Sequence, residues 1–454
     1  MSDSIDARFE YKEDSNHHSV DESHNMKLGN YVKIGQDLCQ AMVDHEDRMN
    51  AQKNGISTSS VDVQKSDRPM ALICETSRAR VIELAEKILA MTVDPETNLL
   101  VKSLLYHFCA CLKIAVDLDI AKHIPRFGRA TAGELAVATG AQENLLVRVM
   151  RVLTANVVFD ECPLGVYGHT AMSWVMRGPG QKYLLTHRLD EGFRSSSQMA
   201  EALRKCGYRE PVLGDRFGFN LAFQTDASFW EYVGHTDPMR GKNFDAAMEV
   251  VGNNDVDIIP MLFPFDTLSK SGGIIVDIGG GLGHVGRRIL AHYPISALRC
   301  IVQDQSTATR SSFITNSCEL ANGHSETQTS DTRITFQQHN FFDRQPVNGA
   351  AAYLLRYILH DWPDNACKDI LKQIVPAMDK DHSRILICDQ VMDDNLPSQS
   401  SILYDIDMMS MFGGKERRLS EWQALITESD PRLHITNVRK LSTSSMTMIE
   451  VRIA

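Results

Sequence analysis

The segment GGIIVDIGGGLG, residues 272–283, decides the fold more than any other part of this sequence. Its Ile-Ile-Val run at 274–276 is β-branched and uninterrupted, which is typical of a strand buried on both faces of a parallel sheet. The glycines that follow let the backbone turn sharply and approach a ligand closely. Behind them, residues 284–292 (HVGRRILAH) have helical spacing. The segment therefore predicts a strand-turn-helix unit that holds a nucleotide-type cofactor at its turn.

Two classes of cofactor compete for this turn. Gly281, Gly283 and Gly286 match the dinucleotide pattern GxGxxG, which is a weak signal when taken alone. A dinucleotide site gains from keeping negative charge away from the helix N-terminus, whereas Asp277 comes directly before these glycines. The alternating set Asp277, Gly279, Gly281 and Gly283 suits a cofactor with a cationic end and no phosphate. We therefore favour S-adenosylmethionine over NAD.

A second acid marks the same site. Asp304 ends another short apolar run, CIVQD at residues 300–304. An acid at the carboxyl end of a strand offers hydrogen-bond acceptors to a ribose diol. Both classes of cofactor carry that diol, so Asp304 supports a cofactor site without distinguishing between them.

The composition is that of an ordinary globular protein. The 454 residues leave room for about two to three domains, and 43% of them are hydrophobic. The formal net charge of −11 argues against nucleic acid or an anionic membrane as a partner. The sequence shows no signal peptide, no apolar stretch that could span a bilayer and no metal-ligand spacing of Cys and His. We therefore expect a cytoplasmic protein without a metal.

The N-terminal part of the chain changes character near residue 68. Residues 1–68 are polar, and we expect a largely disordered tail and linker with one helical pattern at residues 30–49. Beyond them, residues 69–91 and 97–114 have the spacing of long amphipathic helices. The folded part of the protein is thus predicted to begin with helices.

A winged helix-turn-helix is predicted next. Thr131 and Glu134 form a capping box at the start of a short helix, and a second helix spans residues 143–155. Two short strands are expected at residues 157–159 and 165–169, joined by a turn. Helix, helix and two strands in this order are typical of a winged helix.

Winged helices commonly bind DNA, which gives one functional hypothesis for this element. Arg148 and Arg151 would then lie on the recognition helix. However, that helix is apolar over most of its circumference, which indicates that it packs against other parts of the protein. We therefore favour a structural or dimer-forming role.

From residue 264 onward, short apolar runs alternate with helical patterns, which predicts a doubly wound sheet. Further strands are expected at residues 334–338, 351–359 and 384–391. Ligand chemistry in such sheets gathers outside the carboxyl ends of the strands. His360, Asp361 and Asp389 stand near such ends and are therefore candidate catalytic residues.

The last part of the sequence points to a family. Two strand-like runs, residues 433–438 and 446–453, predict a terminal hairpin, which is a feature of methyltransferases. Five motifs occur in order: VDIGGGLG, IVQDQ, YLLRYILHDWPD, ILICDQVM and MFGGKERRLSEW. With them, the chain from about Thr97 onward resembles the plant and fungal S-adenosylmethionine-dependent O-methyltransferases of the caffeate and flavonoid type.

The resemblance implies an α/β fold in which an N-terminal α-helical winged-helix dimerisation domain precedes a Rossmann-like methyltransferase domain. We expect four regions: a tail at 1–68, a winged-helix domain at 69–190, a helical linker and substrate-pocket segment at 191–263, and a catalytic domain at 264–454. The resemblance also implies S-adenosylmethionine as cofactor, a small-molecule substrate and a homodimer, with neither nucleic acid nor membrane as partner. In this family the histidine before Asp-Trp, here His360, is the general base, and two acids, here Asp389 and Glu416, flank it.

The chemistry favours those residue types independently of the resemblance. A phenol, with a pKa of about 10, is a poor nucleophile until its proton leaves. An imidazole such as that of His360 can accept this proton near neutral pH. A carboxylate on the other ring nitrogen would orient the ring and stabilise the imidazolium. Asp389 or Glu416 fits that role.

Three positions depart from the family pattern. Asn340, next to Phe341, replaces the acid that usually holds the adenine, although an amide can also hydrogen-bond a base edge. Arg356 stands where members of the family often have lysine, and Asp389 is one methylene shorter than the usual glutamate. We expect Asn340, Phe341 and Arg356 to contact the cofactor, with altered binding strength.

The substrate pocket is predicted to use aromatic and thioether side chains, which suit a phenolic or polyketide-type secondary metabolite. The candidate substrate-binding residues are Phe223, Trp230, Met248, Asp361, Met408 and Phe412. Packing in an ordinary core explains the apolar members of this set equally well. Some fungal proteins of this fold instead catalyse pericyclic, cyclisation or dehydration reactions, which is the rival hypothesis. His360 with both flanking acids favours methyl transfer.

Overall fold

The computed structural model describes residues 32–50, 67–305, 331–394, 397–441, 444 and 446–454. The chain divides into two units, residues 1–105 and 106–454. The disordered tail predicted for residues 1–68 lies mostly outside the described residues, and within it residues 32–50 form a helix.

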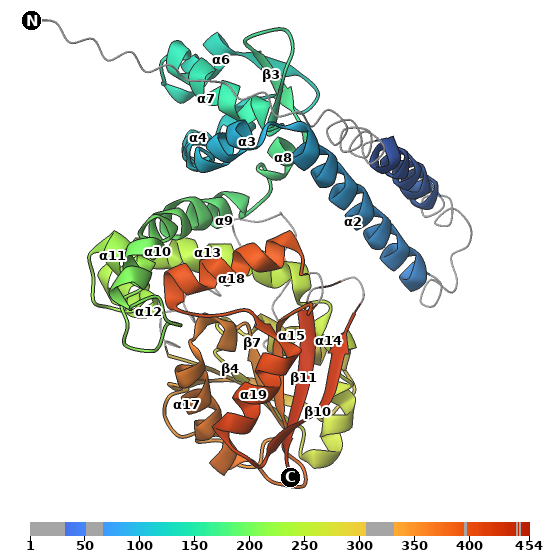
Figure 1. Cartoon of the computed structure of the whole chain (residues 1–454). Coiled ribbons are helices and arrows are strands. Elements are labelled where there is room, and N and C mark those ends of the chain that lie inside the picture. The colour runs from blue at the N-terminus through green and yellow to red at the C-terminus, as the bar shows by residue number, and fades with distance from the viewer. Residues whose placement is uncertain (1–31, 51–66, 306–330, 395–396, 442–443, 445) are drawn as a thin grey trace, which may run out of the picture. The chain divides into compact units, whose positions relative to one another are not determined.

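The first unit is helical where it is described (Figure 1). It contains α2 (Asp67–Thr92) and α3 (Pro95–Ser103). Asp94 caps α3, because its carboxylate accepts a hydrogen bond from the Thr97 amide at 2.9 Å. The prediction of one helix over residues 97–114 was wrong: α3 ends at Ser103 and α4 begins at Tyr106. No Gly or Pro in the sequence marks this break.

Among the described residues, no single helix combines the length and the hydropathy that crossing a bilayer requires. The bent pair of α3 and α4 reaches that length and composition only when the two helices are taken together.

The second unit begins at residue 106, within the winged-helix domain predicted for residues 69–190, and it starts with the part that contains the predicted winged helix. Its elements are α4 (Tyr106–Asp117), α5 (Ile120–His123), β1 (Arg129–Thr131), α6 (Ala132–Thr139), α7 (Glu143–Ala155), β2 (Phe159–Glu161), β3 (Val166–His169) and α8 (Ala171–Val175). The strands form a three-stranded sheet in the order β1-β3-β2. The predicted capping box of Thr131 and Glu134 is present, and Gly140 ends α6 in a left-handed conformation.

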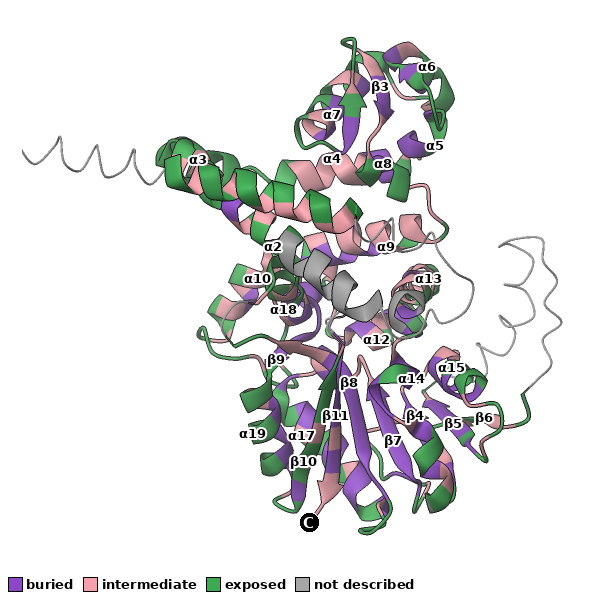
Figure 2. Ribbon diagram, turned by 90° about the vertical axis from the view of Figure 1, so that its right-hand side faces the viewer, coloured by how far each residue is buried: buried purple, intermediate pink, exposed green. Residues whose placement is uncertain are grey.

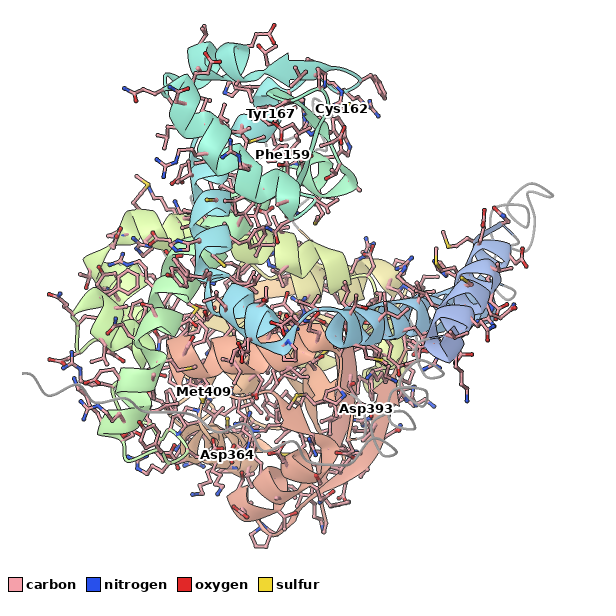
Figure 3. The ribbon with its side chains drawn as sticks, turned by 45° about the horizontal axis from the view of Figure 1, so that its top comes forward. Phe159, Cys162, Tyr167, Asp364, Asp393 and Met409 are labelled. Atoms are coloured by element: carbon pink, nitrogen blue, oxygen red, sulfur yellow. The ribbon has the colours of Figure 1, made fainter. Side chains whose placement is uncertain are left out.

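The predicted packing of α7 is confirmed. Leu146, Met150 and Leu153 on this helix are fully buried in one core with Phe159 and Tyr167 of the small sheet, two side chains that Figure 3 labels. Strand β2 starts two residues later than predicted because Val157 has a φ of 59°, a left-handed conformation that a strand does not allow. The sequence placed Val157 in a strand because it is β-branched.

A helical segment then leads to the sheet. Its elements are α9 (Gln181–His187), the π-helix η1 (Arg188–Gly192), α10 (Phe193–Lys205), α11 (Gly218–Phe223), α12 (Phe229–Glu231), the π-helix η2 (Tyr232–Thr236), α13 (Pro238–Asp255), α14 (Ile259–Leu262) and the 3-10 helix η3 (Phe265–Ser271). Single-turn π-helices are frequent near functional sites. The two in this segment border the aromatic cluster described below.

The region predicted to be the catalytic domain is built on an eight-stranded sheet with β10-β11-β8-β7-β4-β5-β6 as its main order and β9 paired to β8. Its elements are β4 (Ile274–Ile278), α15 (His284–His292), β5 (Arg299–Asp304), β6 (Ile334–Gln338), β7 (Ala352–Arg356), the 3-10 helix η5 (Leu359–Asp361), α17 (Asp364–Ile374), the 3-10 helix η6 (Val375–Ala377), β8 (Ile385–Met392), α18 (Gln399–Phe412), β9 (Arg417–Arg418), α19 (Leu419–Ser429), β10 (Leu433–Lys440) and β11 (Met446–Ile453). The predicted terminal hairpin is confirmed, since β11 pairs antiparallel with both β10 and β8.

Helices cover both faces of this sheet (Figure 2). One apolar core contains α14 and α15, and the other contains α17 and α19. The central strands β4, β7 and β8 lie between the two cores, so most of their residues are buried. This explains the uninterrupted apolar runs in the sequence.

The prediction that one strand covers residues 351–359 was wrong at its end. β7 stops at Arg356, and Tyr357 has a φ of 52°, in the left-handed region. The chain turns there into the short 3-10 helix η5 (Leu359–Asp361). His360 therefore lies on a tight turn beyond the carboxyl end of β7.

Candidate active site

The glycine turn after β4 has the geometry expected of a cofactor cradle. Gly279, Gly281 and Gly283 have φ values of +68°, +57° and +77°, which side chains rarely adopt. A Cβ added at Gly279 would lie 2.5 Å from the Ile358 side chain. A Cβ added at Gly280 would lie 2.5 Å from the carboxyl group of Asp277. This turn therefore depends on the absence of side chains.

Asp277 lies at the end of β4, under the glycine turn, and is 1% exposed. Its Oδ2 has no hydrogen-bond partner among the residues that the structure describes. Burial raises the pKa of Asp277 to about 7, although the nearby charge of Arg356 lowers it. A buried carboxylate oxygen without a partner is costly unless a ligand satisfies it. The ammonium group of S-adenosylmethionine is a ligand of that kind, so the cradle fits this cofactor.

The other predicted cofactor-binding residues lie near the same turn. Asp304 Oδ2 accepts a hydrogen bond from the Gly281 amide at 3.0 Å. Asn340 Oδ1 accepts one from the Phe342 amide at 3.1 Å, so the amide group that replaces the usual acid also supports its own turn. Phe341 lies next to it and would be 3.9 Å from a Cβ at Gly279.

Arg356, at the end of β7, lies near both turns. Its guanidinium carbon is 4.7 Å from the centre of the Tyr357 ring. Its Nε and one terminal nitrogen are buried without a hydrogen-bond partner in the described part of the chain. Its charge lowers the pKa of Asp277, so Arg356 lies close enough to influence the predicted cofactor site.

The predicted base, His360, is held from several sides. Its Nδ1 lies 2.8 Å from Glu416 Oε1, and its Nε2 lies 3.4 Å from Asp361 Oδ1. The imidazole stacks on the Tyr357 ring, with centres 5.2 Å apart. The side chain of His360 remains 15% exposed. The ring is therefore oriented by Glu416 and still open to a substrate.

The surrounding acids change the proton affinity of this ring. Burial by itself lowers the pKa of His360, but Asp361 and Glu416 outweigh it and raise the pKa to about 10. Burial raises the pKa of Asp361 to about 6 and that of Asp389 to about 7. The site thus stabilises an imidazolium strongly.

The structure decides between the two acids that the sequence offered as partners of the ring. Glu416 makes the hydrogen bond to His360, whereas both carboxylate oxygens of Asp389 lack a partner among the described residues. Asp389 is fully buried on β8 and acts on His360 only through its charge. The lack of a hydrogen bond between Asp389 and His360 agrees with a side chain that is one methylene shorter than glutamate.

Two residues that support the acids around His360 were not predicted from the sequence. Asp405 on α18 accepts a hydrogen bond from the Glu416 amide at 2.9 Å. Arg188 on η1 forms an ion pair with Asp407 of α18, and its charge lowers the pKa of Asp361. Arg188 and Asp361 are far apart in the sequence, and no motif links them.

The predicted substrate-binding residues are distributed over several elements. Trp230 stacks on Phe412 of α18, with ring centres 5.5 Å apart. Phe223 stacks on Phe219 with centres 4.6 Å apart, and Met408 is 5% exposed in the same aromatic cluster. Met248 is half-buried on α13. Trp230, Phe412, Phe223 and Met408 therefore belong to a packed aromatic cluster, while Asp361 touches the base.

Comparisons with known proteins agree with this architecture. Residues 209–430 match the model of the O-methyltransferase domain, and residues 102–177 match that of the O-methyltransferase dimerisation domain. The chain is 48% identical over 377 residues to O-methyltransferase penK of Penicillium thymicola, covering 83% of this chain and 84% of that protein. It is 33% identical to the sterigmatocystin 8-O-methyltransferase of Aspergillus flavus, covering 79% of this chain and 82% of the relative.

Solved structures show the same fold. OxaC superposes with a TM-score of 0.76 at 22% identity, over 94% of this chain and all of that chain. A structure described as a pericyclic reaction enzyme superposes with a TM-score of 0.69 at 25% identity, over 83% of this chain and 94% of that chain.

The chain belongs to the O-methyltransferase family, with its catalytic and dimerisation domains. It is an enzyme that transfers a methyl group from S-adenosylmethionine to oxygen. The glycine turn and His360 lie at the carboxyl ends of β4 and β7, which are neighbours in the sheet. The fold thus brings the expected cofactor cradle and the expected base to one edge.

Proposed function

We propose that this enzyme methylates a phenolic hydroxyl of an aromatic or polyketide-type secondary metabolite, with His360 as the general base. The hydrogen bond between His360 Nδ1 and Glu416 carries the proposal, because it leaves Nε2 as the nitrogen that can accept a proton. The name of one relative, sterigmatocystin 8-O-methyltransferase, gives oxygen 8 of sterigmatocystin as its methyl acceptor.

The cofactor would be held by residues around the glycine turn. Asp277 would bind its ammonium group, Asp304 its ribose, and Asn340 with Phe341 its adenine. When bound, S-adenosylmethionine supplies a methyl group on a positively charged sulfur. Arg356 would compete with the ammonium group for the charge of Asp277 and so moderate cofactor affinity.

His360 would remove the proton of the acceptor hydroxyl through Nε2. Glu416 keeps the ring oriented, and together with Asp361 it stabilises the imidazolium that forms. Because the pKa of His360 is raised to about 10, the ring holds a proton at neutral pH in the free protein. The fraction of neutral ring grows as the pH rises, so we expect activity to increase from neutral into the alkaline range.

The dimerisation domain supports a homodimer as the working form. We expect light scattering of the purified protein to give twice the mass of 50.8 kDa for one chain. A monomeric mass at assay concentration would contradict this.

The rival function is a pericyclic, cyclisation or dehydration reaction, which the fold of one structural neighbour supports. Incubation with methyl-labelled S-adenosylmethionine and a panel of phenols separates the two functions. We expect label in a methyl ether product, formed at least about 100-fold more slowly by the His360→Gln variant. Conversion of a polyketide without transfer of label would favour the rival function.

A further inference from the structure

Residues 413–417 lie along the turn that carries His360 and donate several hydrogen bonds to its backbone. The Lys415 amide donates a hydrogen bond to the carbonyl oxygen of His360 at 2.9 Å. The Arg417 guanidinium donates to the carbonyl oxygen of Leu359 at 3.0 Å and to that of Trp362 at 2.9 Å. Arg417 thus holds the backbone on both sides of His360.

The guanidinium of Arg417 has little freedom to move. Its side chain is 1% exposed, and it donates from Nε and one terminal nitrogen to Asp364 Oδ1 at 2.9 and 2.7 Å. Its carbon atom lies 5.2 Å from the centre of the Trp422 ring. Burying an arginine is costly unless its donors are satisfied. Here they are satisfied by Asp364, by the Lys415 carbonyl oxygen and by the backbone of the turn that carries His360.

The segment can approach the turn this closely because Gly414 has no side chain. A Cβ at this position would lie 2.1 Å from the carbonyl oxygen of His360 and 2.8 Å from the carbonyl carbon of Asp361. The next residues, Lys415 to Arg417, therefore run directly along the turn. Glu416 binds the ring of His360 and Arg417 binds the backbone that carries it.

We propose that Arg417 is a positioning residue for methyl transfer, which holds the Leu359–Trp362 turn so that the His360 ring stays against Glu416. The inference rests on the proposed role of His360 as base. It assigns to Arg417 no contact with substrate or cofactor. Because Glu416 and Arg417 are adjacent in the chain, any shift of the turn relative to this segment lengthens the bond between ring and carboxylate. Small misplacements of a catalytic group lower rates strongly.

The groups that face the His360 ring set its pKa, so they determine how a looser turn would change that pKa. They are Asp361 of η5, Asp389 of β8, Glu416 before β9 and the Tyr357 ring. Of these, Glu416 forms the hydrogen bond to the ring, and its position relative to the turn depends on Arg417. A looser turn weakens that bond and destabilises the imidazolium, so the pKa of His360 should fall.

The test compares Arg417→Lys, which keeps the charge and loses the fork of donors, with Arg418→Lys at the adjacent exposed position. The pKa of His360 is measured by NMR in the free enzyme labelled with 13Cε1-histidine, and the His360→Gln variant identifies its signal. We expect R417K to lower this pKa by about one unit. We also expect R417K to lower kcat about 10- to 100-fold, with cofactor affinity unchanged and R418K like the wild type.

A second variant covers the case in which R417K does not fold. Asp364, which is labelled in Figure 3, orients the guanidinium from a side chain that is 52% exposed. Asp364→Asn should leave the protein folded and shift the pKa of His360 in the same direction by a smaller amount. A folded R417K, or D364N in its place, with the wild-type pKa of His360 would overturn the proposal. The NMR titration needs no methyl-acceptor substrate, so it tests the role of Arg417 even if the enzyme methylates no phenol.

Discussion

The turn after β4 and the turn after β7 lie on adjacent parallel strands, yet they are built in opposite ways. The first consists of glycines in left-handed conformations above a buried carboxylate oxygen without a described partner. In the second, the carbonyl groups of Leu359, His360 and Trp362 all accept hydrogen bonds from residues 415–417. We therefore expect a ligand to satisfy this carboxylate oxygen at the first turn, whereas the backbone of the second turn is hydrogen-bonded by the protein itself.

This difference follows from what each turn does. A binding site gains affinity from polar groups that only the ligand satisfies. A catalytic group gains rate from being held in place before the reaction begins. Changes at the first turn should therefore act on cofactor affinity, and changes at the second on the chemical step.

The largest expected effect comes from removing the base. His360→Gln should lower kcat by about 10²- to 10⁴-fold, because the ring nitrogen that accepts the proton is lost. Cofactor affinity, measured by calorimetry, should stay unchanged, since the glycine turn is intact. His434→Gln, at an exposed position on β10, is the matched control. An H360Q enzyme with the wild-type kcat would remove His360 from the mechanism.

An intermediate effect is expected at the first turn. Asp277→Asn should weaken S-adenosylmethionine binding roughly 10- to 100-fold, because a hydrogen bond to a charged group is lost. The pKa of His360 should not change, which separates the two turns. Asp381→Asn, at an exposed position, serves as the control for titration calorimetry. Undiminished cofactor affinity in D277N would show that the carboxylate does not bind the ammonium group.

The smallest effect is a shift of the pH profile. Asp361→Asn removes an anion that stabilises the imidazolium, so the pKa of His360 should fall. The rise of kcat/KM with pH should then move to lower pH by roughly 1 unit. The measurement is a pH–rate profile of D361N beside exposed Asp369→Asn. An unmoved or alkaline-shifted profile would contradict the assigned role of Asp361.

Much of the fold was predictable from local patterns. The capping box at Thr131, the helix α15 and the strand β6 follow from side-chain chemistry and periodicity, which act over a few residues. The errors arose where backbone conformation overrides propensity. Val157 and Tyr357 both adopt left-handed φ values, which neither valine nor tyrosine would predict from the sequence.

The candidate catalytic residues were predictable from the sequence, but the hydrogen bonds and charge interactions between them were not. The residue types and their place after strands suggested His360 and Asp389, and the resemblance to the family added Glu416. The choice between the two acids depends on a difference of one methylene and on how β8 and the segment before β9 approach the ring. Asp405, Arg188 and Arg417 act through contacts between distant parts of the chain.

By itself, the sequence determined the class of fold and the glycine turn and predicted His360 as the base, because strand periodicity, glycine conformation and imidazole chemistry are local properties. Only the tertiary structure decided that Glu416 binds the ring, that Asp389 acts through charge alone, and that Arg417 clasps the turn. Hydrogen bonds form over about 3 Å, and the distances between segments distant in the chain are set by packing of the whole domain.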